Sequence, residues 1–387
     1  MIAVLGECVA DSFTTRHPAA PSGPAPTTPA DPSPPAGDPP TRVDNGASRL
    51  GGGPPREGGR PVGGEVPSKG GRPVGDGPSG EGGRPVGGEV RPGEETEGLA
   101  LRVLPGGGPA NTAVALARLG TPTRFLGRLS RDVFGEMFRD RFTASGVDLS
   151  ACVEAEEPST LSVAALDPHG RAAFTFYTDG AADWQWRPHE LDARRVGPFR
   201  CLHTGSMALV GKPGREAVEE FASSAAGHAT ISIDPNVRPS FATRDDYQVT
   251  RWCEWTDILK LSDDDLDLLL PGTSMERACD TWHAAGARLI VVTRGAAGAL
   301  VSVDGERAGV RAPEVDVVDT VGAGDAFTAG LLHALDAQGH LGGRLDDLDL
   351  ETAVAAAGFA TRVAALTCSV AGANPPWSHH LTTAAPR

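Results

Sequence analysis

Positive charge is scarce in this sequence: 35 lysines and arginines stand against 50 aspartates and glutamates, which gives a formal net charge of −15. Phosphate backbones attract basic surfaces, so this balance argues against a nucleic-acid partner. A phosphorylated small molecule is not excluded, because it needs only a local cluster of hydrogen-bond donors. The composition therefore leaves small-molecule chemistry open.

Long apolar segments are also missing. No basic start is followed by a long apolar stretch, and residues 1–9 already read as the beginning of the first strand. We therefore expect no signal peptide, no membrane span and a cytoplasmic protein.

Closely spaced cysteines and histidines are absent as well. The six cysteines are scattered with no Cys-x-x-Cys pair and no metal-ligand spacing, and the ten histidines are isolated. We expect reduced, mostly buried thiols. A Walker-type Gly-x-x-x-x-Gly-Lys-Ser/Thr sequence does not occur, so any phosphate site must be built differently.

Residues 17–97 contain almost no aromatic or large aliphatic side chain and are rich in proline, glycine and glutamate. Such a segment cannot bury enough apolar surface to offset its chain entropy, so we predict a disordered low-complexity insert. Gly-Gly-Arg-Pro-Val-Gly recurs in it at 58–63, 70–75 and 82–87. A repeat this short provides no stackable core; it fits a tolerated expansion in a surface loop, with a docking or regulatory role as the alternative.

Outside the insert, residues 1–16 hold the first core strand and residues 98–387 the remainder of one folded domain. Apolar runs predict strands and alternate with helical stretches such as 110–119. This alternation predicts an α/β fold with a mostly parallel sheet covered by helices on both faces. Residues 163–166 and 172–177 have the pattern of a β-hairpin. The predicted core strands span residues 2–5, 229–234, 257–261 and 288–293.

The most informative run is Asp-Thr-Val-Gly-Ala-Gly-Asp-Ala-Phe at 319–327. It places a glycine-rich turn between a predicted strand, Val315 to Val318, and a predicted helix, Ala326 to Leu335. The backbone N–H groups of Gly322, Ala323 and Gly324, with the positive end of the helix dipole, suit the charge of a transferring phosphoryl group. Asp325 at this turn is placed to accept the proton of an attacking hydroxyl.

A second glycine-rich stretch, Gly-Gly-Gly-Pro-Ala-Asn at 106–111, precedes the helix at 110–119. Glycine lets the backbone approach a polyhydroxylated ligand closely, and Asn111 offers both a donor and an acceptor. Asp11, after the first strand, is suited to accept two vicinal hydroxyls. Each feature alone is also compatible with an ordinary turn or a solvated carboxylate.

Together these motifs resemble the ribokinase-like (PfkB) family of sugar and nucleoside kinases over almost the whole chain outside the insert. The resemblance implies a three-layer αβα sandwich with a mostly parallel central sheet and a small β-sheet lid, which starts within residues 1–16 and includes strands near residues 160–180. It also implies an ATP-dependent carbohydrate kinase in which Asp325 is the general base and Gly322–Gly324 the anion hole. Asp11, Gly107 and Asn111 would hold the sugar.

The resemblance further implies ATP contacts at Thr293 and Gly295. Lys260 and Asp263 occupy the place where many members carry an Asn-x-x-Glu motif that organises Mg²⁺ and phosphates; here the acidic residue is equally compatible with a charged helix start. Asp319 would supply part of a monovalent-cation site, occupied by K⁺ where such an ion is used. The cofactors expected are thus ATP and Mg²⁺.

Several stretches are similar to the fructokinase-like branch, including Gly6-Glu7, His203 to Ser206 and Ser232 to Arg238. One departure is Thr178, where fructokinases of this kind often have arginine. Fructose 6-phosphorylation is the best single hypothesis; ribose or 2-keto-3-deoxygluconate are alternative substrates, and a non-catalytic sugar-responsive regulator is an alternative of another class. An exposed lid edge predicts a homodimer.

Overall fold

The computed structural model of the chain describes residues 1–14, 101–166 and 172–383. All the described residues belong to one compact unit. The predicted insert at 17–97, with its repeats, lies outside the described residues.

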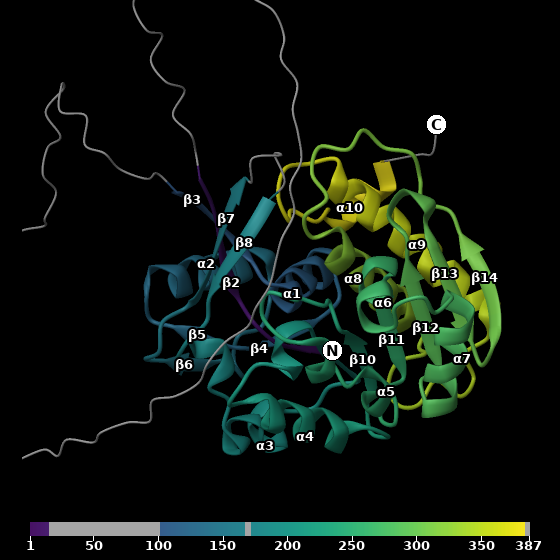
Figure 1. Cartoon of the computed structure of the whole chain (residues 1–387), viewed down its shortest axis with the longest axis horizontal. Helices are drawn as coiled ribbons and strands as arrows, with labels where there is room; N and C mark the ends of the chain where they lie inside the picture. Colours follow the sequence, from purple (N-terminus) through teal and green to yellow (C-terminus); the bar gives the residue numbers. More distant parts are fainter. Residues whose placement is uncertain (15–100, 167–171, 384–387) are drawn as a thin grey trace, which may run out of the picture. The chain divides into compact units, whose positions relative to one another are not determined.

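An eight-stranded sheet in the order β14-β13-β12-β11-β10-β9-β1-β4 forms the centre of the described unit (Figure 1). Neighbouring strands from β4 to β12 are parallel. Strand β13 pairs antiparallel with both of its neighbours, β12 and β14. The predicted mostly parallel sheet is therefore confirmed. Its strands are β1 (Ile2–Leu5), β4 (Thr123–Leu126), β9 (Cys201–Gly205), β10 (Thr230–Asp234), β11 (Ile258–Ser262), β12 (Leu289–Thr293), β13 (Ala299–Val303) and β14 (Glu306–Val310).

The central strands are apolar on both faces because helices cover both. In β1, Ile2 and Val4 enter one buried cluster, whereas Ala3 and Leu5 enter another. Successive side chains of a strand point to opposite faces, so a strand buried on both sides reads as a continuous apolar run. This is why the sequence predicted these strands well.

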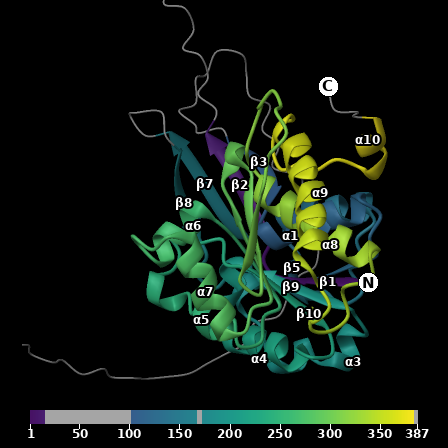
Figure 2. The same cartoon turned by 90° about the vertical axis from the view of Figure 1, so that its right-hand side faces the viewer.

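Two groups of helices make the outer layers, and Figure 2 shows them on opposite sides of the strands. Helices α1, α2, α8 and α9 supply the cluster that contains Ile2, and α4, α5, α6 and α7 supply the other. The α-helices are α1 (Gly108–Arg118), α2 (Val133–Ser145), α3 (Ala193–Val196), α4 (Arg215–Ala225), α5 (Val249–Trp252), α6 (Asp263–Leu269), α7 (Met275–Ala285), α8 (Ala323–Ala337), α9 (Leu350–Cys368) and α10 (Ser378–Thr383). Short 3₁₀ turns are η1 (Ala182–Trp184), η2 (Pro188–Leu191), η3 (Ser206–Leu209), η4 (Arg244–Asp246) and η5 (Gly295–Ala297).

A second sheet of four strands, in the order β3-β2-β7-β8, leaves the central sheet after β1. Strands β7 and β8 pair antiparallel, which confirms the predicted hairpin, although its connection at 167–171 lies outside the described residues. A third sheet consists of two short parallel strands, β5 and β6. These strands are β2 (Val9–Thr14), β3 (Leu101–Gly106), β5 (Arg128–Ser130), β6 (Val153–Ala155), β7 (Thr160–Leu166) and β8 (Ala172–Tyr177).

The predicted strand at Val315 to Val318 is wrong. This segment is an irregular connection between β14 and α8, and the side chains of Val317 and Val318 are 63% and 62% exposed. The N–H groups of Val318 and Asp319 donate to the carbonyl of Cys368 at the end of α9, at 2.8 and 3.2 Å. The backbone is therefore paired without a strand neighbour.

All six cysteines are free thiols, four of them buried, in agreement with the expectation. In the part of the chain that the structure describes, no helix is both long and apolar enough to cross a bilayer.

Candidate active site

A cavity of about 570 Å³ opens at the carboxyl ends of the central strands, the edge where ligands of open α/β sheets bind. We call it the charged cavity, because acidic and basic side chains from several strands and loops line it. Seven predicted site residues are among its lining: Asp11, Gly107, Asn111, Lys260, Gly322, Gly324 and Asp325.

A second cavity of about 810 Å³, the apolar cavity, is lined mostly by glycine, alanine, valine and phenylalanine. The predicted residues Thr293, Gly295 and Ala323 line it. Both cavities include Thr320 and Gly324 in their walls, so they meet at the glycine-rich turn. Two ligands could thus contact the same turn from opposite sides.

The turn itself is the start of α8. Gly322 is the N-cap with φ 77°, a left-handed conformation that favours glycine. The N–H of Ala323 donates to the carbonyl of Thr320 at 3.2 Å. Within the described ranges, the N–H groups of Gly322 and Gly324 have no protein acceptor, as expected for the first turn of a helix. These groups, with the helix dipole, form a site for negative charge.

Asp325 lies in the first turn of α8 and in the wall of the charged cavity. Asn111, from α1, donates from Nδ2 to Oδ2 of Asp325 at 2.9 Å. Burial raises the pKa of Asp325 to about 6, and the Asn111 hydrogen bond and the Lys260 charge oppose that rise. A carboxyl in this state is still mostly ionised at neutral pH and is a better proton acceptor than a solvated aspartate.

Lys260 brings a buried positive charge to the same turn. Its ammonium donates to Oδ2 of Asp234 at 2.7 Å, and both side chains are at most 10% exposed. A Cβ placed at Gly324 would come within 3.0 Å of the Lys260 nitrogen. Burial lowers the pKa of Lys260, but the carboxylates of Asp234, Asp265 and Asp325 outweigh burial and raise it, so the cation persists.

Asp11 and the loop before α1 also line the charged cavity. Ser162, on β7, donates from its hydroxyl to Oδ1 of Asp11 at 2.8 Å, and burial raises the pKa of Asp11. Gly107 has φ 95°, and a Cβ there would lie 2.6 Å from the carbonyl oxygen of Glu7. The loop can therefore pass close to the end of β1 only with glycine at this position.

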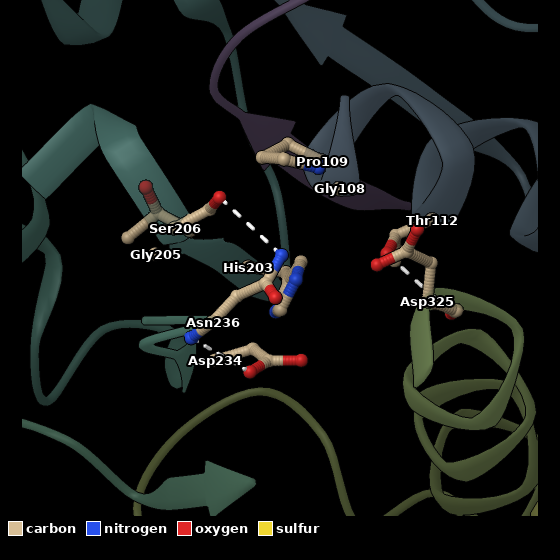
Figure 3. Close-up of a pocket in the computed structure, with 10 residues that line it drawn as sticks. Gly108, Pro109, Thr112, His203, Gly205, Ser206, Asp234, Asn236 and Asp325 are labelled. Carbon is tan, nitrogen blue, oxygen red and sulfur yellow. Dashed lines mark hydrogen bonds between the residues drawn. The ribbon is translucent and has the colours of Figure 1, made fainter. Parts of the chain in front are cut away.

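Figure 3 shows a smaller pocket beside Asp325, in which Ser206, Asp234 and Asn236 lie on one side and Thr112 and Asp325 on the other. A small polar hollow of about 10 Å³ lies among them, close to the room that one water needs. The backbone N–H of Asn236 donates to Oδ1 of Asp234 at 3.2 Å.

The sequence profile described as pfkB family carbohydrate kinase matches residues 86–380. The chain belongs to this family. Among similar proteins, a fructokinase from Rhizobium leguminosarum bv. trifolii is 36% identical over 234 residues, covering 59% of this chain and 71% of that protein. A fructokinase from Klebsiella pneumoniae is 35% identical over 245 residues, covering 61% and 78%.

Solved structures agree on the fold of this pfkB-family kinase. The crystal structure of a fructokinase with bound ATP from Xylella fastidiosa superimposes with a TM-score of 0.71 at 23% identity, covering 98% of this chain and 97% of that one. A fructokinase from Vibrio cholerae, bound to fructose, ADP and calcium, gives 0.63 at 23% identity, covering 96% and 94%. The expected ribokinase-like α/β fold is thereby confirmed.

Two predicted residues of the kinase lie outside the lining of both cavities. Asp263 is in the first turn of α6, where Ser262 and Asp265 form a capping box. Asp319 accepts the N–H groups of Val321 at 3.0 Å and Gly372 at 2.8 Å, and so joins the turn to the segment after α9.

Sequence reasoning assigned no role to Glu7. Its side chain is fully buried against the charged cavity, and neither carboxyl oxygen has a hydrogen-bond partner among the described residues. Burial raises the pKa of Glu7 to about 7, and the nearby Ser206 hydroxyl opposes that rise only in part. The Gly-Glu pair after β1 was visible in the sequence, but its burial was not.

Asp183 and Arg141 are further polar residues that the sequence did not single out as site residues. Asp183, in η1, accepts the N–H of Cys8 at 2.8 Å and the hydroxyl of Thr160 at 2.7 Å, and so joins the starts of β2 and β7. Arg141, on α2, donates to Oδ1 of Asn111 at 3.2 Å. No sequence motif connects these residues with their partners.

Proposed function

We propose that this kinase transfers the γ-phosphoryl group of ATP to a hydroxyl of fructose, giving fructose 6-phosphate. The observation that carries the proposal is the position of Asp325, a partly buried carboxyl that lies beside a free helix N-terminus where the charged and apolar cavities meet. The similar proteins named fructokinase support fructose as the acceptor.

In the proposed reaction, a sugar hydroxyl in the charged cavity attacks the γ-phosphorus of ATP. Asp325 accepts the hydroxyl proton while the new oxygen–phosphorus bond forms and the bond to the bridging oxygen of ADP breaks. The N–H groups of Gly322 and Gly324, together with the Lys260 ammonium, stabilise the negative charge on the transferring group. Catalysis then rests on positioning and on electrostatics already in place before the substrates bind.

Asp11, Gly107 and Asn111 hold the sugar in this proposal. Asp11 accepts hydrogen bonds from sugar hydroxyls on the lid side, and Asn111 contacts both the sugar and Asp325. Thr293 and Gly295, which line the apolar cavity, contact ATP. The second sheet carries Asp11 on β2, so its approach over the sugar would also exclude water.

The described residues contain no group of three or more acidic, histidine or cysteine side chains that could hold a metal ion. This fits Mg²⁺ entering with ATP, because Mg²⁺ usually keeps several waters and binds through substrate phosphates plus one or two carboxylates. Asp263 lies outside the lining of both cavities, so its indirect contact with Mg²⁺ stays a prediction. A monovalent cation such as K⁺ beside Asp319, a homodimer through the lid and a cytoplasmic location stay predictions.

Another sugar acceptor, such as ribose or 2-keto-3-deoxygluconate, is kept because of Thr178. This residue, which stands where fructokinases often have arginine, lines two other surface hollows and not the charged cavity. Arg238 is the cation that lines the charged cavity from the loop after β10. A non-catalytic regulator is less well supported, because the turn and Asp325 are intact.

The test is ATP consumption by the purified full chain with fructose, ribose, glucose, 2-keto-3-deoxygluconate and adenosine, with Asp325→Ala in parallel. We expect sugar-dependent turnover, fastest with fructose, that falls about 10²- to 10⁴-fold in the variant. Turnover with a different sugar would redirect the substrate assignment. Sugar binding without turnover in the wild type would favour the regulatory alternative.

A further inference from the structure

Arg141 on α2 donates hydrogen bonds to three segments that adjoin the proposed site. Its side chain is mostly buried. It donates from Nη1 to the carbonyl of Pro105, from Nη2 to Oδ1 of Asn111 at 3.2 Å, and from Nη2 to the carbonyl of Ala373. One guanidinium thus joins β3, α1 and the segment after α9.

The chemistry of Asn111 gives the second of these contacts its meaning. An amide side chain has one accepting oxygen and one donating nitrogen, whereas a guanidinium only donates and an ionised carboxylate only accepts. Arg141 therefore bonds the oxygen of Asn111, and Asp325 takes the nitrogen at 2.9 Å. With both partners in place, only one orientation of the amide is favourable.

The third contact reaches the anion site. Ala373 packs against Gly322 so closely that a Cβ at Gly322 would lie 2.7 Å from the Cβ of Ala373. Arg118, the last residue of α1, holds the same segment, donating to Oδ1 of Asn374 at 2.6 Å and to the carbonyl of Pro375 at 3.0 Å. Arg118 and Arg141 thus share the anchoring of this segment, but only Arg141 touches Asn111.

We propose that Arg141 is a positioning residue for phosphoryl transfer: it fixes the Asn111 amide so that Asn111 always donates to Asp325 and keeps that carboxylate ionised and aimed at the acceptor hydroxyl. This inference rests on the proposed function, since it assigns Asp325 the role of base. In the absence of Arg141, the amide is free to turn its oxygen toward the carboxylate, and Asp325 then takes up a proton more readily.

The charges around Asp325 decide how such a change is observed. Lys260 from β11 and Arg238 from the loop after β10 favour the ionised form, and Asp234 opposes it. The carboxylate of Glu7, after β1, also repels that of Asp325. The positive charge of Arg141, on α2, attracts the Asp325 carboxylate. Burial lowers the pKa of Arg141 to about 10, so its positive charge is retained at neutral pH.

The experiment compares Arg141→Met, which keeps the aliphatic stem, with Arg141→Lys, Arg118→Met and Arg139→Met in the full chain. Arg139 is a matched control on α2: like Arg141 it is of intermediate exposure, and its guanidinium donates to the carbonyls of Ser130 at 2.7 Å and Leu129 at 3.0 Å. The readouts are kcat, both KM values, the pH dependence of kcat, and the carboxyl carbon shift of Asp325 by NMR. Because Glu7 titrates nearby, the pH profiles are repeated with Glu7→Gln added.

For Arg141→Met we expect kcat to fall about 10- to 100-fold, as for other misplacements near 1 Å. The acidic limb of the pH profile and the NMR titration of Asp325 should both move to higher pH. Arg141→Lys should recover part of both effects by restoring a donor. Arg118→Met should leave the titration of Asp325 in place, and Arg139→Met should keep kcat within about twofold.

A folded Arg141→Met protein with the wild-type kcat and an unmoved Asp325 titration would overturn the proposal. So would an equal shift of that titration in Arg118→Met, because the effect would then come from anchoring the segment after α9. Absence of sugar-dependent turnover in the wild type would instead count against the proposed function. In that event the NMR titration of Asp325 still tests whether Arg141 fixes the orientation of the Asn111 amide.

Discussion

The two cavities are neighbours with opposite character. The charged cavity gathers ionisable groups from separate parts of the chain, among them Glu7, Asp11, Asp234, Lys260 and Asp325. The apolar cavity is larger and has only two acidic residues in its described lining, Glu314 and Asp316, both exposed. The kinase therefore concentrates its buried charge on one side of a single turn.

In the proposed function the sugar occupies the charged cavity and ATP the apolar cavity, and this difference in lining distinguishes the two ligands. A sugar presents hydroxyls in a particular arrangement, so its site needs placed donors and acceptors, each of which loses solvation when buried. A nucleotide base and ribose can be held by shape and backbone contacts, which demand no buried charge. We expect substitutions on the charged side to affect stability and sugar recognition, and substitutions on the apolar side to affect ATP alone.

The largest expected effect concerns the cost of buried charge and uses Glu7→Gln. The folded pKa of Glu7 is about 7 against an ordinary value of 4.5, so ionised Glu7 destabilises the fold. This penalty is complete above pH 7, declines as the pH falls, and vanishes below about pH 4.5. At pH 8 the neutral glutamine should raise the free energy of unfolding by up to about 3 kcal/mol, and at pH 5 by less than about 1 kcal/mol.

Urea unfolding at the two pH values measures this difference. Exposed Glu254 provides a control, since Glu254→Gln removes the same charge from the surface and should change stability little at either pH. A Glu7→Gln protein that is less stable than the wild type at pH 8 would contradict the view that the buried charge of Glu7 lowers the free energy of unfolding.

The next effect concerns sugar recognition and uses Asp11→Asn. This change keeps the shape and removes the charge that accepts the Ser162 hydroxyl at 2.8 Å. Hydrogen bonds to charged groups contribute about 1.5–3 kcal/mol, so the KM for the sugar should rise roughly 10- to 100-fold. The KM for ATP should change by less than about twofold, and steady-state kinetics with each substrate varied in turn measures both.

Asp140, exposed on α2, supplies the matched control, because Asp140→Asn removes the same charge from a residue outside the cavity lining. Equal increases in both KM values for Asp11→Asn would mean that the two cavities do not divide the substrates as proposed.

The smallest expected effect tests the apolar side. Ala364, on α9, lines the apolar cavity, and Ala364→Leu would fill part of its volume. Overpacking costs about 1–3 kcal/mol, so the KM for ATP should rise about tenfold or more while the KM for the sugar stays near the wild-type value. Ala355, exposed on the same helix, gives the control Ala355→Leu. A sugar KM that rises as much as the ATP KM would break the comparison.

The sequence predicted the parts of the fold that have strong local signals. The run 289–292 is apolar at every position because β12 is buried on both faces, and such a run identifies a central strand. The turn at Gly322 and Gly324 was predicted because helix starts that bind anions need this chemistry within a few residues. The segment 315–318 failed because its valines have the composition of a strand while its side chains are exposed.

The long-range pairs could not be predicted from a single sequence. Lys260 and Asp234 lie on neighbouring parallel strands, and their ion pair depends on the order of the strands in the sheet. Arg141 reaches Asn111 only because α2 packs beside α1, and no spacing along the chain encodes that contact. The charges that tune Asp325 are therefore a property of the folded topology and not of any motif.

The pairing of β2 with β3 has a consequence for engineering. Thr14 and Leu101 are register partners in this antiparallel pair, so the sheet holds the chain at these two points at the spacing of adjacent strands, near 5 Å. A foreign domain with neighbouring termini could be spliced between them without separating the strands. Asp11 lies three positions away on β2, so a fluorescent reporter inserted there would be linked by a short, stiff path to the residue proposed to touch the sugar.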